Sequence, residues 1–150
     1  MAYEAFENAG RTMHDLAGSR TSVYSSCFVT DYTQISSFDS QYRSLHESTG
    51  HSSALVSNRV SWFFDLRGPS MTVDTGCSGS TVAFDLAVRS LRTGDATCAL
   101  ACGVNLILAP DPYIGMSAFN FVGPEGISYS FDHRAKYAIL RYQPLQPSLT

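Results

Sequence analysis

The sequence lacks any long apolar segment and any cluster of positive charge. Its apolar runs, such as VNLILA at 104–109, are far shorter than the roughly 20 residues that a membrane-spanning helix needs. Lys and Arg together number 10 against 13 Asp and Glu, which gives a net charge of −3 and no basic patch. We therefore expect neither nucleic acid nor a membrane as a partner.

Export signals and a disulfide pattern are also lacking. No basic segment followed by an apolar one opens the chain, and no Asn-x-Ser/Thr acceptor site occurs. The four cysteines do not form the dense framework of a small secreted domain, and they fit a compartment in which thiols stay reduced. These features predict a cytoplasmic protein.

What is present favours a folded domain of alternating helices and strands. The 150 residues are 44% hydrophobic, which is enough for one packed core. Apolar periodicity and breaker residues predict helices at 2–8, 30–38, 52–66 and 80–94, strands at 20–29, 70–75 and 96–108, and a polar loop at 39–51. This order implies an α/β fold with a central sheet.

Two of these elements carry more specific predictions. The apolar residues of 80–94 cover most of the helix circumference, which predicts a helix that is buried on most sides and ends at Gly94. Asp85 and Arg89, four residues apart, are expected to pair on its remaining side. The segment 96–108 is a long apolar run, which predicts an interior strand although its alanines are weak strand formers.

Cys77 lies in the stretch DTGCSGS (74–80), between a predicted strand and a predicted helix. Unpaired N–H groups and the positive end of the helix dipole favour a thiolate at such a place, and small neighbours let a bulky substrate approach. The segment therefore suits covalent acyl transfer through a thioester on Cys77. A buried structural cysteine is an equally open interpretation. A Gly-x-Ser/Cys-x-Gly hydrolase elbow is disfavoured, because Cys77 and Ser78 each lack one of the two glycines.

The remaining cysteines and histidines favour structural roles over chemistry. Cys98 and Cys102 have no partner pair with metal-ligand spacing, which favours core packing and no metal site. Cys27 is expected in a core strand. Loop bracing by Asp132, His133 and Arg134 is favoured over catalysis. Three histidines lie in polar segments, where a solvated side chain is expected: His14, His46 and His51.

Five stretches together give the chain a resemblance to a known family. They are YEAFENAG (3–10), LAGSRTSVYSS (16–26), ALVSNRVSWFFDLRGPSMTVDTGCSGS (54–80), LRTGDATCALACGVNLILAPDPYIGMS (91–117) and GPEGISYSFDHRA (123–135). From about residue 2 to about residue 135, the chain resembles the β-ketoacyl synthase domain of polyketide and fatty acid synthases. It most resembles the domain of fungal highly reducing polyketide synthases.

The resemblance implies a truncated thiolase-like fold, part of the layered α/β/α/β/α architecture of the full domain. It also implies that Cys77 is the acyl-accepting nucleophile, the one catalytic residue expected here. The full domain would load an acyl group from the phosphopantetheine of an acyl carrier protein and condense it with a malonyl unit, with loss of carbon dioxide, and would bind no cofactor directly. Full domains pair as homodimers, and SSALVSNRVSWF (52–63) resembles part of the pairing region.

The sequence departs from the family in its decarboxylation machinery. Family members use a lysine and two histidines of their second half, the histidines in a His-Gly-Thr-Gly-Thr and an Asn-x-Gly-His setting, and neither setting occurs in this sequence. We therefore expect that the chain accepts an acyl group at most. The alternative is a catalytically inactive truncated product that only pairs with a full synthase.

The resemblance ends after residue 135. The family continues with a glycine-rich Asn-Gly-Tyr-x-Arg-Gly-Glu-Gly run, whereas this chain reads KYAILRYQPLQPSLT. We interpret 1–135 as a partial ketosynthase domain and 136–150 as a divergent tail, and we expect a truncated gene, a frameshift or an unspliced intron near codon 135. Because a half-domain leaves core faces uncovered, the isolated chain is expected to be poorly soluble or partly unfolded.

Overall fold

The structure is a computed structural model of the 150-residue chain, and it describes residues 1–28, 30–38, 41, 45–119, 121–122 and 129–134. The chain divides into two compact units, Met1–Leu106 and Ile107–Thr150, each of which is described by itself. The predicted tail at 136–150 lies outside the described residues.

The first unit contains most of the secondary structure. In chain order its elements are α1 (Ala2–Asn8), α2 (Met13–Leu16), β1 (Thr21–Ser26), α3 (Asp31–Ser37), α4 (Glu47–His51), α5 (Leu55–Phe63), β2 (Ser70–Val73), α6 (Gly79–Thr93) and β3 (Cys98–Gly103). The described part of the second unit contains the helix α7 (Asp111–Ala118). All seven helices and strands predicted from the sequence are present, with shorter bounds for most of them.

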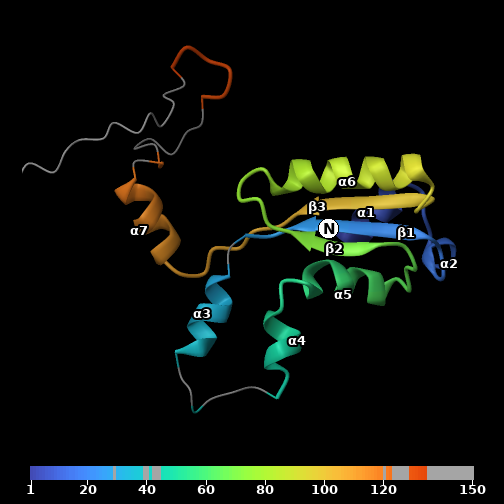
Figure 1. The fold of residues 1–150 in the computed structure, drawn as a ribbon, viewed down its shortest axis with the longest axis horizontal. Helices are drawn as coiled ribbons and strands as arrows, with labels where there is room; N and C mark the ends of the chain where they lie inside the picture. Colours follow the sequence, from blue (N-terminus) through green and yellow to red (C-terminus); the bar gives the residue numbers. More distant parts are fainter. Residues whose placement is uncertain (29, 39–40, 42–44, 120, 123–128, 135–150) are drawn as a thin grey trace, which may run out of the picture. The chain divides into compact units, whose positions relative to one another are not determined.

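Three parallel strands form the sheet in the order β2-β1-β3 (Figure 1). Ser26 at the end of β1 is in register with Val73 of β2 and Gly103 of β3, so the carboxyl ends of all three strands meet at one edge. Parallel α/β sheets bind their ligands at the carboxyl ends of their strands, so a functional site is expected at this edge.

The prediction of an interior strand at 96–108 is wrong. β3 spans only Cys98–Gly103 and lies at an edge of the sheet among the described residues, whereas β1 lies in the middle and all six of its residues are buried. Three of the apolar residues that follow Gly103 are exposed, namely Val104, Leu106 and Leu108. The strand at 20–29 is also shorter than predicted, because Cys27 follows the end of β1, and residue 29 is outside the described residues.

The two faces of the sheet are covered by different helices, α6 on one side and α5 on the other (Figure 1). On one face Val23 of β1 and Leu100 of β3 pack with Phe6, Leu16, Phe64 and Leu66. On the opposite face Tyr24 packs with Ala83 and Ala87 of α6. Val23 and Tyr24 are neighbours on one strand and therefore point to opposite faces, so β1 contributes to both cores.

Helix α6 is buried along one side only, which corrects the prediction of a helix buried on most sides. Its buried residues are Gly79, Ala83, Ala87 and Ser90, all small and spaced at helical intervals. Small side chains let the helix axis come close to the sheet, whereas Leu86 is only half-buried against the core and Phe84 is 62% exposed. As predicted, Gly94 ends the helix in the left-handed conformation, at φ 78°.

Two short helices, α4 and α2, were not predicted from the sequence. The segment 39–51, predicted to be a loop, ends in the short helix α4, while 39–40 and 42–44 lie outside the described residues. Thr12 and Asp15 form a reciprocal capping box at the start of α2, a Thr-x-x-Asp variant of the usual pattern that the sequence prediction missed.

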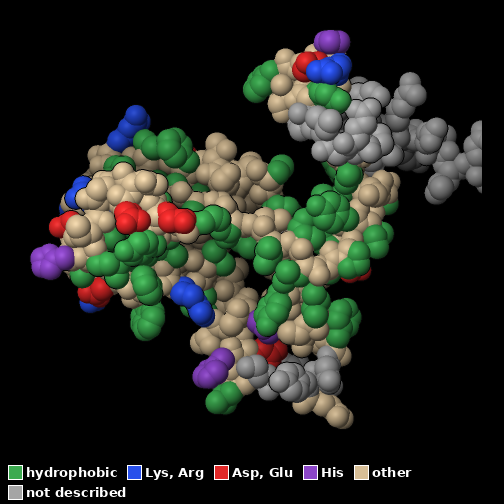
Figure 2. Space-filling model, turned by 180° about the vertical axis from the view of Figure 1, so that it is seen from behind, with side chains coloured by type: hydrophobic (Ala, Val, Ile, Leu, Met, Phe, Trp, Pro, Cys, Tyr) green, Lys and Arg blue, Asp and Glu red, His purple; other side chains and the backbone are tan. Residues whose placement is uncertain are grey.

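Large apolar side chains are exposed on the surface, where Figure 2 shows them in green on one face. Trp62 of α5 is 82% exposed, and Phe63 beside it and Phe84 of α6 are exposed as well. Among the described helices, none combines the length and the apolar character needed to cross a membrane.

Candidate active site

Cys77 lies in the turn that joins β2 to α6, after the carboxyl end of β2 and two residues before the helix starts at Gly79. The residue is exposed. A structural role would require a sulfur buried in the core, so the geometry disfavours that interpretation and leaves the thiol open to a substrate. The strand–turn–helix placement that the sequence predicted for Cys77 is therefore present in the structure.

Hydrogen bonds within the turn fix the backbone on both sides of Cys77. The carboxylate Oδ1 of Asp74 accepts from the Gly76 N–H at 3.0 Å, and the Ser78 hydroxyl donates to the Thr75 carbonyl at 2.9 Å. Gly76 has φ 62°, in the left-handed region that favours glycine, which explains a glycine directly before the cysteine.

The start of α6 lies directly against the ends of two strands. A Cβ on Gly79 would overlap the Oγ of Ser26, the last residue of β1, and a Cβ on Gly103, the last residue of β3, would lie 2.8 Å from the Cβ of Ser80. Both glycines are therefore required for the helix to begin at this edge of the sheet. Sequence analysis missed Ser26 and Gly103 as parts of the site, because only the fold brings them beside residues 79 and 80.

The amino-terminal end of α6 can stabilise negative charge close to Cys77. The N-cap residue Ser78 makes no side-chain capping bond to the helix, since its hydroxyl donates to Thr75 instead. The positive end of the dipole of this 15-residue helix is thus not neutralised by a side-chain cap. Such an end favours the oxyanion that forms when a sulfur attacks a carbonyl.

The other cysteines are less accessible than Cys77. Cys27 follows the end of β1, whereas Cys98 and Cys102 are in β3, and all three are half-buried. Burial raises the pKa of the Cys102 thiol above its usual value, which lowers its reactivity at neutral pH. The residues that the structure describes hold no group of three or more His, Cys, Asp or Glu side chains placed to bind a metal ion.

The three histidines of the first unit lie in or directly before short helices. His14 is in α2 and His46 is the N-cap of α4, and both are exposed, as predicted for solvated side chains. His51 ends α4 and is half-buried, with Nε2 3.3 Å from the Ser36 Oγ and its ring edge-on to Tyr32 at 5.3 Å. The prediction of a solvated His51 is therefore wrong. Within the described residues, no hydrogen bond joins any of these histidines to Cys77.

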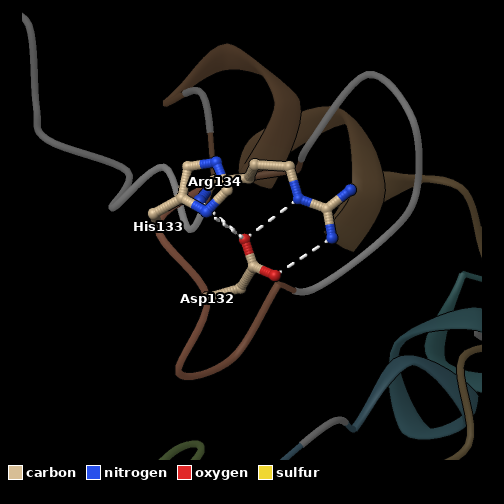
Figure 3. A network of polar contacts seen from close by, with 3 residues as sticks. All are labelled: Asp132, His133 and Arg134. Carbon is tan, nitrogen blue, oxygen red and sulfur yellow. Dashed lines mark hydrogen bonds and ion pairs between the residues drawn. The ribbon is translucent and has the colours of Figure 1, made fainter.

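His133 belongs to a charged turn in the second unit (Figure 3). The Arg134 guanidinium donates from Nε to Asp132 Oδ1 at 2.9 Å and from an Nη to Oδ2 at 3.0 Å, and His133 Nδ1 lies 3.3 Å from Oδ1. The hydrogen bonds from Arg134 hold the pKa of the Asp132 carboxyl below its usual range. Arg134 also lies over the Tyr129 ring at 4.4 Å, so the predicted loop-bracing role is confirmed.

A cavity of about 290 Å³ lies at a different place, among α1, α2 and the end of α5. Tyr3, Phe6, Arg11 and Phe64 contribute to its lining, and Cys77 does not. The candidate site is therefore an open turn at the sheet edge, and the cavity belongs to the packing of the N-terminal helices.

A parallel α/β sheet with an exposed cysteine at its carboxyl edge, just ahead of a helix, is the arrangement expected of a thiolase-like protein. Residues 1–138 match the model of the β-ketoacyl synthase N-terminal domain, and the chain belongs to the β-ketoacyl synthase family. A highly reducing polyketide synthase of Fusarium pseudograminearum is 51% identical over 135 residues, and the compactin diketide synthase of Penicillium citrinum is 47% identical over 135. Each of these matches covers 90% of this chain.

Solved structures agree with the fold. The ketosynthase from module 6 of the bacillaene synthase of Bacillus subtilis matches 83% of this chain with a TM-score of 0.72 and 30% identity. An oxazolomycin ketosynthase domain of Streptomyces albus matches 80% with a TM-score of 0.69 and 37% identity. The chain spans 5% of the two polyketide synthases, and 20% and 21% of the two solved ketosynthase chains. The predicted resemblance and the thiolase-like fold are thus confirmed.

Proposed function

We propose that this chain provides the acyl-accepting part of a ketosynthase and that Cys77 is its nucleophile. The observation that carries the proposal is the exposed position of Cys77 in the turn between the carboxyl end of β2 and the start of α6. Membership of the β-ketoacyl synthase family supports it, because the resemblance assigns acyl loading to the cysteine at this position.

The proposed reaction is a thioester exchange. The Cys77 sulfur, as a thiolate, attacks the carbonyl carbon of an acyl thioester, and the oxyanion that forms is stabilised by the amino-terminal end of α6. The bond between the carbonyl carbon and the donor sulfur then breaks, and the departing thiolate takes up a proton from solvent. The acyl group is left on Cys77 as a thioester.

The donor in this proposal is the phosphopantetheine arm of an acyl carrier protein, which brings the acyl group without being a resident cofactor of this chain. Decarboxylative condensation with a malonyl unit is the second step of the full domain. By the resemblance it uses histidine and lysine settings that this sequence does not hold. We therefore propose that these 150 residues supply the acyl-loading step and not the condensation step. A reducing cytoplasm is the compartment in which the four cysteines would stay as thiols.

The test is to incubate the 150-residue chain with a hexanoyl N-acetylcysteamine thioester and to locate the acyl group by peptide mass spectrometry. We expect one hexanoyl group on Cys77, none in Cys77→Ala, and an unchanged result in Cys102→Ala, the matched control. Equal acylation of the Cys77→Ala chain would contradict the proposal. In parallel, release of carbon dioxide from a malonyl thioester should not exceed the rate without protein, and a higher rate would overturn the assignment of loading without condensation.

A second candidate function is pairing with another ketosynthase chain. It is favoured by α5, whose Trp62 is 82% exposed and lies with the exposed Phe63 in the segment that resembles the pairing region of the family. Light scattering after size exclusion should then give the mass of a dimer for the unsubstituted chain and of a monomer for Trp62→Ala. A monomeric unsubstituted chain would exclude self-pairing through this surface.

A further inference from the structure

The start of α6 packs tightly against the end of β1 at Gly79 and Ser26. Ser26 is the last residue of β1 and is buried, and Gly79 is the first residue of the helix and is buried as well. A Cβ on Gly79 would lie 2.9 Å from the Cβ of Ser26 and would overlap its hydroxyl oxygen. Only one of the two positions can therefore carry a side chain in this geometry.

The close contact between Ser26 and Gly79 determines the position of the turn that precedes Gly79. Gly79 N–H donates to the Gly76 carbonyl at 3.2 Å, so residues 76–79 form one closed turn, and Cys77 is inside it. A side chain forced in at position 79 would have to push the helix start away from β1, and the turn would move with it. The backbone of Ser26 is held in place and cannot shift to make room. Its carbonyl accepts from the Val104 N–H at 2.9 Å, and Ser26 is paired with β2 on one side and β3 on the other.

A second contact of the same kind supports this interpretation. Gly103, the last residue of β3, meets the Cβ of Ser80, the next residue of α6, and a Cβ on Gly103 would lie 2.8 Å from it. The first two helical residues are therefore each in contact with the end of a different strand. This arrangement limits both sliding and tilting of the helix start, and with it the displacement of Cys77.

We propose that Ser26 and Gly79 form a size-complementary pair that positions the Cys77 sulfur for acyl transfer, with Ser26 acting as a positioning residue. The inference rests on the proposed function of Cys77 and adds the residue that sets its location. Displacement of a catalytic group by about 1 Å already lowers the rate of a reaction that depends on orientation. A shift of the turn should therefore slow acyl transfer to Cys77 more than it slows attack on a small reagent that needs no orientation.

The experiment compares four versions of the 150-residue chain: unsubstituted, Gly79→Ala, Ser26→Gly, and the double variant. Gly115→Ala serves as a matched control, because Gly115 is also in a helix and a Cβ there would meet nothing within 4 Å. For each chain we would measure the rate constant and the half-saturating concentration for acylation of Cys77 by a hexanoyl N-acetylcysteamine thioester. Alkylation of Cys77 by iodoacetamide and the midpoint of urea unfolding are measured alongside.

We expect Gly79→Ala to lower the acylation rate constant about tenfold or more, with the iodoacetamide rate changed by about twofold or less. Restoring the space with Ser26→Gly in the double variant should return the acylation rate to within about threefold of the unsubstituted chain. Gly115→Ala should leave both rates unchanged. A folded Gly79→Ala chain that acylates normally, or a double variant no better than the single one, would overturn the inference.

Two further outcomes are decisive as well. If Gly79→Ala does not fold, a double variant that folds and acylates supports the pair, and one that also fails to fold contradicts it. If the unsubstituted chain takes no acyl group, the proposed function fails. In that case the urea midpoint tests the coupling of positions 26 and 79. A double variant that recovers the midpoint lost in Gly79→Ala supports the coupling, and one that does not recover it contradicts the coupling.

Discussion

Thr72 of β2 lies within hydrogen-bond distance of Ser57 of α5, with 3.0 Å between the two hydroxyl oxygens. The same Thr72 oxygen lies 3.0 Å from the Ser25 Oγ on the neighbouring strand and accepts from the Ser57 N–H at 3.3 Å. Ser25 and Ser57 are both fully buried. One half-buried threonine therefore joins the centre of the sheet to the helix that covers it, through polar contacts with two buried serines.

Replacement of this threonine should be costly. Thr72→Val keeps the shape of the side chain but leaves the buried hydroxyls of Ser25 and Ser57 without this partner, which typically destabilises by about 1–3 kcal/mol. Urea unfolding monitored by circular dichroism should show a lower midpoint for Thr72→Val. The control is Thr97→Val, at an exposed threonine, where we expect a change of less than about 0.5 kcal/mol. Equal effects of the two substitutions would contradict the role of the network.

Two buried serines should respond oppositely to the same substitution. The Ser57 hydroxyl is bonded, whereas the Ser90 hydroxyl, in a residue only 4% exposed, has no hydrogen-bond partner among the described residues. Ser57→Ala should lower the free energy of unfolding by about 1 kcal/mol or more. Ser90→Ala should raise it by about 0.5 kcal/mol or more, because it removes an unsatisfied polar group and adds helix propensity. A destabilised Ser90→Ala chain would show that this hydroxyl has a partner.

The cysteines should differ in their reaction with iodoacetamide. Cys77 is exposed and open to the reagent, whereas Cys102 is half-buried, and burial raises the pKa of its thiol above the usual value. At pH 7 we expect Cys77 to be modified before Cys102. The Cys102 rate should keep rising with pH beyond the value of about 8.5 at which a free cysteine is half ionised. Peptide mass spectrometry of timed samples would measure both rates, and Cys77→Ala shows whether labelling of one affects the other.

Acid should weaken the first helix turn of α2. The Thr12 side chain and backbone N–H donate to Asp15 and hold the pKa of its carboxyl below the usual range. A depressed pKa in the folded state stabilises the fold above the unfolded pKa of about 3.9, and this contribution is lost as the pH falls through the lower folded value. Between pH 6 and pH 2.5 the urea midpoint of the unsubstituted chain should therefore fall more steeply than that of Asp15→Asn. Parallel pH profiles would contradict the capping interaction.

The sequence predicts the elements of this fold better than their burial. Helix 80–94 and the strand before it follow from local periodicity and from Gly94, which are properties of neighbouring residues. That Phe84 is exposed and Ala83 is buried depends on the sheet that the helix meets, and the helical pattern alone does not identify that face. For the same reason the apolar composition of 96–108 predicted an interior strand, whereas the central place belongs to β1, which has three serines and a threonine.

Only part of the candidate site could likewise be predicted from the sequence. Cys77 could be identified from the small residues around it and from the change from strand to helix, because all of that information lies within a few residues of sequence. Ser26 and Gly103 could not, since they come from strands about 50 residues before and 25 residues after the cysteine and are brought to it only by the register of a parallel sheet. Long-range neighbours of this kind leave no local pattern.

The central position of β1 also has a consequence for folding. The contact between Ser25 and Thr72 spans 47 residues of chain, and that between Ser22 and Cys98 spans 76. Of the three strands, β1 is synthesised first, and both of its edges therefore remain unpaired until β2 and β3 have been synthesised. Such late pairing slows folding and prolongs the time in which one nascent strand can join another, so the rate of synthesis and the chaperones present should govern the yield of this protein.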